Sequence, residues 1–201
     1  MRANICCKLA LVVSLLTGPF SARIEKKAQC HTPTIDPSLT DQLADQEPKT
    51  EPRFKELPES LLNAELKSAR RGRFKLSSYK GNVVVLSLWA TWCGPCRFQT
   101  PVLVKLQTDF ASRGVKVIEL STEDPVASAA SVRHWMRTYK VNYRVGWAPQ
   151  DVSISLMQGN TAIPQLLLIR DGKIVKRFIG FNRDQTPSMM KQAIEEALKQ
   201  D

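Results

Sequence analysis

Histidine and cysteine are scarce in this chain, and their scarcity limits the kinds of site it can build. The 201 residues include two histidines and five cysteines. A structural zinc site needs four ligands, and beside the cysteine pair discussed below only Cys30, His31 and His134 remain as partners. Two of these three lie in a proline-rich tail, so we expect no bound metal and no other cofactor.

Long hydrophobic runs are also missing. The apolar run over residues 9–16 is shorter than the roughly 20 residues that span a bilayer as a helix. Arg2 and Lys8 precede the run, and small or helix-breaking residues follow it up to Ala22. This order predicts a secretory signal peptide over residues 1–22, with an uncleaved membrane anchor as the alternative. We therefore expect a periplasmic or otherwise exported protein, tethered to the membrane if the segment is retained.

Acidic residues are too few to balance the basic ones. The chain has 19 Asp and Glu against 29 Lys and Arg, which gives a net charge of +10. Loss of residues 1–22 would remove Arg2 and Lys8 and leave +8. The densest basic cluster lies within residues 67–75, where we expect a solvated hairpin. No nucleic-acid-binding motif accompanies the cluster, so no nucleic-acid partner is expected.

Residues 23–58 lack apolar periodicity. Five prolines fall between His31 and Pro58, among charged and small polar residues, and such a segment buries too little surface to offset its ordering entropy. The segment is interpreted as a linker, which leaves residues 59–201 as a single domain. No internal repeat is visible.

The remaining cysteines centre on a CxxC motif. Cys6 and Cys7 would leave with the signal peptide, while Cys30, Cys93 and Cys96 would stay, too few for a disulfide-stapled scaffold. Cys30 is interpreted as an unpaired thiol, with an intermolecular disulfide or a third redox thiol as the alternatives. The two-residue spacing of Cys93 and Cys96 lets them close and reopen a small disulfide.

The residues around the motif predict where its cysteines lie. Residues 83–89 form a continuous apolar run typical of a strand buried on both faces, and a helix kinked at Pro101 is expected over about 95–112. Cys93 then lies at a helix N-terminus, where unpaired N–H groups and the helix dipole favour a thiolate. A thiolate is the attacking species in disulfide exchange.

The rest of the domain has alternating strand and helix patterns. We expect a hairpin formed by residues 62–66 and 72–76, a strand over 116–121 and a helix beginning at Asp124 and Pro125. That helix directs Val132, Trp135, Met136 and Tyr139 to the core and leaves His134 exposed. A short helix over 152–158, a hairpin of 166–169 and 174–179 across an Asp-Gly turn, and a last helix from Thr186 follow.

The sequence WCGPC matches the active site of thioredoxins, and VVVLSLWATWCGPC is similar to exported TlpA-like reductases. Thr161-Ala162-Ile163-Pro164 resembles the proline loop of the same superfamily, and the resemblance covers about residues 60–201. It implies an α/β thioredoxin fold, a mixed central sheet flanked by helices, with an N-terminal β-hairpin extension.

The resemblance also implies roles for individual residues. Cys93 would be the exposed nucleophile and Cys96 the more buried resolving cysteine. The substrate-binding residues would be Trp92, Gly94, Pro95, Ile163 and Pro164. The Ile163–Pro164 peptide bond would be cis and would lie against the cysteines.

Two positions depart from this pattern. Thioredoxins carry a buried Asp where this chain has Ser87, and several TlpA-like reductases carry a Glu where it has Gln99. Neither Ser nor Gln titrates usefully, so the group that manages the proton of Cys96 is not evident from the sequence.

These observations together predict an exported thiol–disulfide oxidoreductase that reduces protein disulfides. A disulfide isomerase and a redox-silent binding or chaperone module are the alternatives. Covalent haem attachment is disfavoured because Arg97, rather than a histidine, follows the second cysteine, and peroxidase chemistry calls for another cysteine setting. The expected partners are protein disulfide substrates and a membrane thiol electron donor, and the protein is expected to be a monomer.

Overall fold

A computed structural model of the chain describes residues 56–199. The predicted signal peptide, Cys30 and most of the predicted linker lie outside these residues. The contacts of the described domain reach back to Glu56, which forms an isolated β-bridge with Lys173, and to Leu57, which is buried. In the described part of the chain, none of the helices combines the length and apolar character needed to cross a bilayer.

Over the described residues, the domain is built on one mixed sheet of seven strands, ordered β2-β1-β5-β4-β3-β6-β7. The central strands β3, β4 and β5 are parallel, whereas β6 and β7 on one side and β1 and β2 on the other are antiparallel to their neighbours. The strands are β1 (Leu66–Ser68), β2 (Arg73–Phe74), β3 (Val83–Trp89), β4 (Val115–Ser121), β5 (Arg144–Trp147), β6 (Gln165–Arg170) and β7 (Lys173–Ile179).

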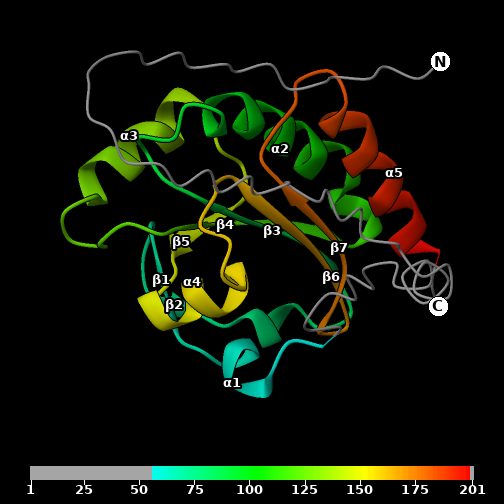
Figure 1. Cartoon of the computed structure of the whole chain (residues 1–201), viewed down its shortest axis with the longest axis horizontal. Coiled ribbons are helices and arrows are strands. Elements are labelled where there is room, and N and C mark those ends of the chain that lie inside the picture. The colour runs from blue at the N-terminus through cyan, green and yellow to red at the C-terminus, as the bar shows by residue number, and fades with distance from the viewer. Residues whose placement is uncertain (1–55, 200–201) are drawn as a thin grey trace, which may run out of the picture. The chain divides into compact units, whose positions relative to one another are not determined.

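Helices cover both faces of the sheet (Figure 1). On one face lie α2 (Cys96–Phe110), α3 (Ala129–Thr138) and α5 (Thr186–Leu198); on the other lie α1 (Glu59–Leu62) and α4 (Gln150–Met157). Two short 3-10 helices, η2 (Leu76–Tyr79) and η3 (Ala111–Arg113), complete the elements of residues 56–199. This arrangement confirms the predicted thioredoxin fold.

The central strand explains why the sheet needs helices on both sides. All seven residues of β3 are buried, and successive side chains point to opposite faces. Val83, Val85 and Trp89 join the core under α2, α3 and α5. The intervening Val84, Leu86 and Leu88 join the core under α1 and α4.

The N-terminal hairpin differs from the prediction. Its first strand is Leu66–Ser68, and the residues expected to begin it instead form α1 and a turn. The second arm shortens to Arg73–Phe74, because the chain enters η2 directly afterwards.

Strand β5 was not predicted. It is four residues long with Gly146 inside it, and short strands that contain glycine give a weak signal. A Cβ atom at Gly146 would lie 2.5 Å from the carbonyl oxygen of Lys67 and 2.8 Å from the Phe74 ring. Glycine therefore lets the hairpin approach β5 closely enough to pair with it.

Other predicted elements are confirmed with shifted ends. The β6–β7 turn places Asp171 and Gly172 at positive φ, as an Asp-Gly hairpin turn requires. Helix α2 continues through Pro101. Helix α3 begins at Ala129, later than predicted, because the Asp124 carboxylate accepts hydrogen bonds from the N–H groups of Val126 and Ala127 in a separate turn.

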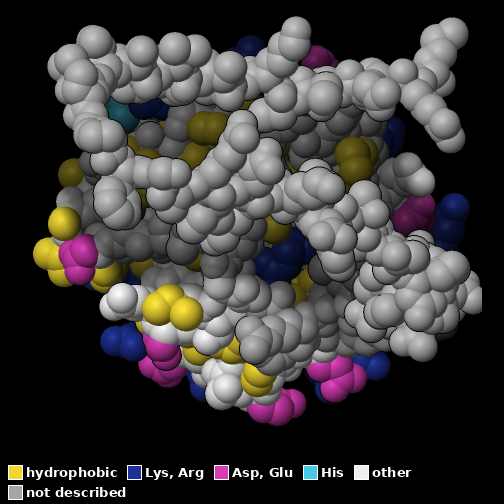
Figure 2. Space-filling view, viewed as in Figure 1, with side chains coloured by type: hydrophobic (Ala, Val, Ile, Leu, Met, Phe, Trp, Pro, Cys, Tyr) yellow, Lys and Arg dark blue, Asp and Glu magenta, His cyan; other side chains and the backbone are white. Residues whose placement is uncertain are grey.

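The surface beneath α1 and α4 is chemically mixed. Figure 2 shows Lys, Arg, Asp and Glu side chains interspersed with single apolar ones along the visible lower edge. Mixed charges with scattered apolar residues are normal for a solvated surface, so this edge does not point to a binding site.

Candidate active site

The CxxC motif lies between the end of β3 and the beginning of α2. Trp89 is the last residue of the strand and Cys96 the first residue of the helix. The sulfur atoms of Cys93 and Cys96 are joined in a disulfide, with the two Cα atoms 5.4 Å apart. The structure therefore brings the predicted redox pair together in its oxidised form.

The two cysteines are less exposed than the motif suggested. Cys93 is 3% exposed and Cys96 is fully buried. The residues around Cys93 are exposed instead: the Trp92 side chain is 68% exposed, and Gly94 and Pro95 are also exposed. The expectation of an exposed Cys93 is wrong for the disulfide form, because its sulfur is covered in the closed ring.

The helix N-terminus acts on Cys93 through one defined group. The backbone N–H of Cys96 donates a hydrogen bond to the Cys93 sulfur over 3.3 Å. The next two amides are paired with nearby carbonyl groups instead: the N–H of Arg97 donates to the carbonyl oxygen of Gly94, and the N–H of Phe98 to that of Pro95. Once the disulfide opens, the Cys96 amide and the helix dipole stabilise negative charge on Cys93.

The predicted proline loop lies against the same core. The Ile163–Pro164 bond is cis. Pro164 is buried, and Ile163 packs on the cluster of buried residues that contains both cysteines. Within residues 56–199, the main chain of Ile163 makes no hydrogen bond. Its N–H and C=O groups are therefore available to an incoming peptide.

Glu123 fixes the loop that carries the CxxC motif. The sequence did not single it out as a site residue. Its carboxylate accepts hydrogen bonds from the backbone N–H of Thr91 at 2.7 Å and from the Thr91 hydroxyl at 2.8 Å. The Ser121 hydroxyl donates to the same carboxylate. Glu123 thus ties the end of β4 to the residues that precede Cys93.

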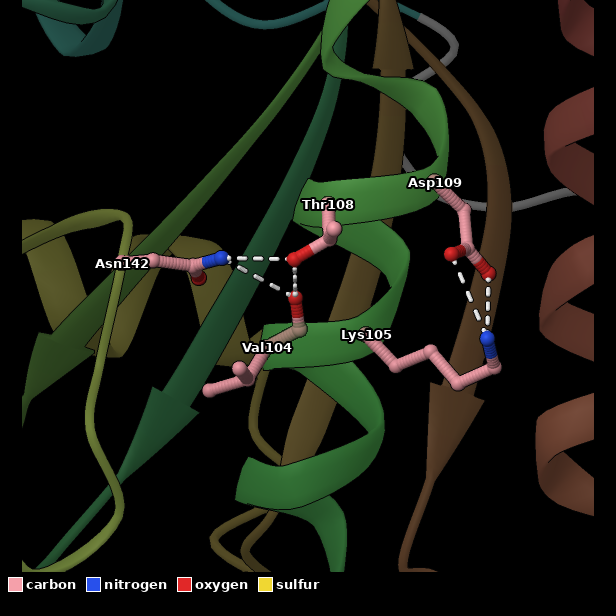
Figure 3. Close-up of polar contacts among 5 residues, drawn as sticks. All are labelled: Val104, Lys105, Thr108, Asp109 and Asn142. Carbon is pink, nitrogen blue, oxygen red and sulfur yellow. Dashed lines mark hydrogen bonds and ion pairs between the residues drawn. The ribbon is translucent and has the colours of Figure 1, made fainter.

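A contact at the far end of α2 fixes the helix against the rest of the domain (Figure 3). The side-chain amide of Asn142, which precedes β5, donates to the Val104 carbonyl at 3.2 Å and to the Thr108 hydroxyl at 2.9 Å. On the neighbouring turn, Lys105 and Asp109 form an exposed ion pair. The amide contact crosses between elements, whereas the ion pair stays within α2.

Beside the motif, the surface is hollowed. A hollow of about 520 Å³ is lined by Thr91 and Arg97 from the active-site segment and by residues of α3 that include His134 and Trp135. His134 is exposed, as predicted, and hydrogen-bonds with Thr138 on its own helix. The position of His134 therefore indicates a residue that lines this hollow rather than a metal ligand.

Polar residues are buried beneath the first turns of α2. The Ser87 hydroxyl donates to the side-chain oxygen of Gln99 at 2.9 Å, and both residues are almost fully buried. The Tyr143 hydroxyl donates to the carboxylate of Glu119, a residue of β4, at 2.9 Å. Burial raises the pKa of Glu119 to about 8, and the hydrogen bond from Tyr143 opposes that rise.

Glu119 was not singled out from the sequence, although a signal was present. It occupies an alternate position of the apolar strand 115–121 together with Val115 and Val117, so the period-two pattern places its carboxyl group on a buried face. The family pattern places an acid only at positions 87 and 99, and Glu119 occupies neither.

Comparisons with known proteins agree with this geometry. The model of the AhpC/TSA family matches residues 58–178. The thiol-disulfide oxidoreductase ResA of Bacillus subtilis is 30% identical over 119 residues, which are 59% of this chain and 64% of ResA. The chain thus spans less than two thirds of the length of that relative.

Two solved structures share the fold. A Chlorobium tepidum protein provisionally described as the thiol:disulfide interchange protein DsbE superposes with a TM-score of 0.62 and 27% identity, covering 72% of this chain and 96% of that one. A Bacteroides thetaiotaomicron protein provisionally described as a protein disulfide isomerase has a TM-score of 0.61 and 27% identity, covering 73% and 89%.

Proposed function

Because the chain belongs to the AhpC/TSA family and has a thioredoxin fold, we propose that it is an exported thiol–disulfide oxidoreductase that reduces protein disulfides through Cys93 and Cys96. The observation that carries the proposal is the Cys93–Cys96 disulfide at the N-terminus of α2, with the Cys96 amide directed at the Cys93 sulfur. ResA, a relative named as an oxidoreductase, supports the same activity.

The first step is an attack by Cys93 in the reduced enzyme. Its thiolate attacks one sulfur of a substrate disulfide, a bond forms between Cys93 and that sulfur, and the other substrate sulfur leaves as a thiolate. The Cys96 amide and the helix dipole lower the free energy of the attacking thiolate.

Cys96 completes the reaction. Its sulfur attacks Cys93, the bond between Cys93 and the substrate breaks, and the substrate leaves with both sulfurs reduced. The short CxxC loop makes this step effectively intramolecular. The enzyme is left with the Cys93–Cys96 disulfide, which is the state in the structure.

The residues around the disulfide suit an extended peptide substrate. Trp92, Gly94 and Pro95 form the exposed rim, and the unpaired main chain of Ile163 before Pro164 can add a substrate strand. We assign these five residues to substrate binding.

The direction of electron flow follows from the residues between the cysteines. The Gly-Pro pair is that of thioredoxins, and a reductase in an oxidising compartment needs an electron donor, for which we propose a membrane protein with its own thiols. Disulfide isomerisation is the second candidate, because the similar Bacteroides protein is provisionally described as an isomerase.

An insulin-reduction assay with dithiothreitol as electron donor tests the proposal. The wild-type protein is expected to accelerate insulin precipitation, Cys93→Ser to abolish the acceleration, and Cys30→Ser, as the matched control, to retain it. Cys96→Ala is expected to accumulate a mixed disulfide with the substrate. A wild-type protein that gives no acceleration would refute the reductase and favour a binding module.

A further inference from the structure

The site has no titratable group at either position where the family pattern would put one. Ser87 and Gln99 occupy those positions, and they hydrogen-bond to each other at 2.9 Å under the first turn of α2. Gln99 lies one turn after Cys96, on the buried side of the helix. When the disulfide opens, Cys96 must still gain a proton, and when it attacks Cys93 it must lose one.

Glu119 is the buried acid closest to this pair in the sheet. In the parallel pairing of β3 and β4, Glu119 is the direct partner of Ser87, so the two side chains point to the same face of the sheet. Helix α2 packs on β4 over that face. The Glu119 side chain is fully buried, between the sheet and the redox helix.

Two unpaired polar atoms mark the same region. Glu119 Oε2 accepts from Tyr143, whereas Glu119 Oε1 is buried without a hydrogen-bond partner among the described residues, and Gln99 Nε2 is likewise buried and unpaired there. Buried polar atoms without partners are uncommon and costly. An unpaired carboxyl oxygen beside the Ser87–Gln99 pair is an atom free to take up or release a proton.

We propose that Glu119 exchanges a proton with the Cys96 thiol in each redox cycle, and so takes over the role that Ser87 and Gln99 cannot perform. This inference rests on the proposed oxidoreductase function. It places the acid–base group of that reaction on β4, which pairs with β3, the strand that leads into the CxxC motif.

The chemistry balances in both directions. In the resolving step, the Cys96 S–H proton passes to the Glu119 carboxylate, the Cys96–Cys93 bond forms, the Cys93–substrate bond breaks, and the substrate sulfur leaves as a thiolate. When a donor thiolate attacks Cys93 in the oxidised enzyme, the disulfide breaks, Cys96 leaves with the electron pair, and it takes the proton from the Glu119 carboxylic acid.

The protonation state of Glu119 fits this cycle. Burial raises its pKa to about 8, so the disulfide form holds a proton at neutral pH. The ionisable group that contacts it is Tyr143, which precedes β5 and whose own pKa lies well above the ordinary value. Ser87, the β3 partner of Glu119, does not titrate in this range. Among residues 56–199, no charged side chain contributes to its shift.

Glu119→Gln tests the proposal, since the amide keeps the size of the carboxyl group and can still accept from Tyr143. We expect disulfide-exchange rates, measured in single turnovers from about pH 6 to about pH 9, to show an inflection in the wild type that the variant loses. The variant rate at neutral pH is expected to fall about tenfold or more, the contribution of a positioned acid–base group.

A double variant that moves the carboxyl group from position 119 to position 99 supplies the matched comparison. Glu119→Gln combined with Gln99→Glu places a carboxyl group one turn after Cys96 and is expected to restore a pH inflection. An exposed control, Glu65→Gln, is expected to leave the profile unchanged. If the wild type and Glu119→Gln show the same pH–rate profile while both remain active, the role of Glu119 is refuted and the oxidoreductase function stands.

A spectroscopic measurement does not depend on how the variant folds. Infrared difference spectra of the wild-type protein, dithiol minus disulfide, are expected to contain a carboxylic-acid carbonyl band that shifts with selective labelling of glutamate and is absent from Glu119→Gln. A wild-type spectrum without a carboxyl band would overturn the proposal. A protein that exchanges no disulfide at any pH would instead overturn the function on which it rests.

Discussion

The two faces of the central sheet are both buried, yet they differ in chemistry. On the face covered by α1 and α4, the side chains of β3 and β4 that are buried are all aliphatic: Val84, Leu86, Leu88, Ile118 and Leu120. On the face covered by α2, the same strands present Ser87 and Glu119 among Val85, Trp89 and Val117. The first face resembles an ordinary core, whereas the second places polar groups under the redox helix.

This difference fits the proposed role of Glu119, for which the fold would give up some stability. A buried carboxyl group with one unpaired oxygen is unfavourable compared with an aliphatic side chain of similar volume. Perturbed carboxyl groups of this kind concentrate at functional sites. The polar residues on the face under α2 are therefore better explained by the reaction at Cys96 than by folding.

The largest expected effect is a pH dependence of stability that originates on the polar face. Because the pKa of Glu119 is about 8 in the folded protein and ordinary when unfolded, the folded state holds a proton that unfolding releases. The contribution of Glu119 to stability should therefore be most favourable below about pH 4.5, fall as pH rises to about 8, and then level off, a change on the order of 5 kcal/mol.

Denaturant unfolding of the oxidised protein across this pH range measures the change. Glu119→Gln is expected to remove this decline, so that the variant is the more stable protein at about pH 8. Equal slopes for the two proteins would show that Glu119 is not a buried, protonated group.

A glutamine substitution on the aliphatic face should destabilise the folded protein much more than one on the polar face. Leu120 is fully buried and adjacent in sequence to Glu119, but points the other way. Leu120→Gln is expected to reduce the free energy of unfolding by about 4 kcal/mol, because it removes aliphatic packing and buries an unpaired amide. Chemical denaturation at about pH 6 compares it with Glu119→Gln, and similar losses for both would remove the distinction between the faces.

Tyr143→Phe sharpens the comparison within the polar face. It removes the hydrogen bond to Glu119 and keeps the ring, at an expected loss of about 1 to 2 kcal/mol. Since that hydrogen bond lowers the pKa of Glu119, its loss should move the inflection in the stability profile to higher pH. An inflection that stays in place would mean that the tyrosine does not act on the carboxyl group.

The solvent side of α2 should give the smallest effects. Asn142→Ala removes the contact between the segment before β5 and α2 (Figure 3) and is expected to cost about 1 kcal/mol. Lys105→Ala removes an exposed ion pair and should change stability by less than about 0.5 kcal/mol. Thermal unfolding of the two variants checks this order, and a larger loss for Lys105→Ala would reverse it.

The sequence was most informative where a hydrophobic pattern and a motif occur close together in the chain. The apolar run of β3, the CxxC motif and the Asp-Gly turn predicted the centre of the fold, because each signal is local and depends on few residues. Strand β5 escaped prediction because its pairing depends on a close approach at Gly146 that only tertiary structure reveals.

The candidate site could be predicted in its sulfur chemistry but not in its acid–base chemistry. Cys93 and Cys96 follow from their spacing, whereas the link from Glu119 to the redox helix depends on the pairing of β3 with β4. The same pairing of distant residues explains why Glu123 and its contacts to Thr91 were missed.

Equilibration of the protein with glutathione redox buffers at several pH values tests the central claim most directly. We expect one reversible two-electron transition that disappears in Cys93→Ser, with a potential whose pH dependence changes slope near the pKa of Glu119, about 8. A pair that cannot be reduced and reoxidised while the domain remains folded would contradict the account.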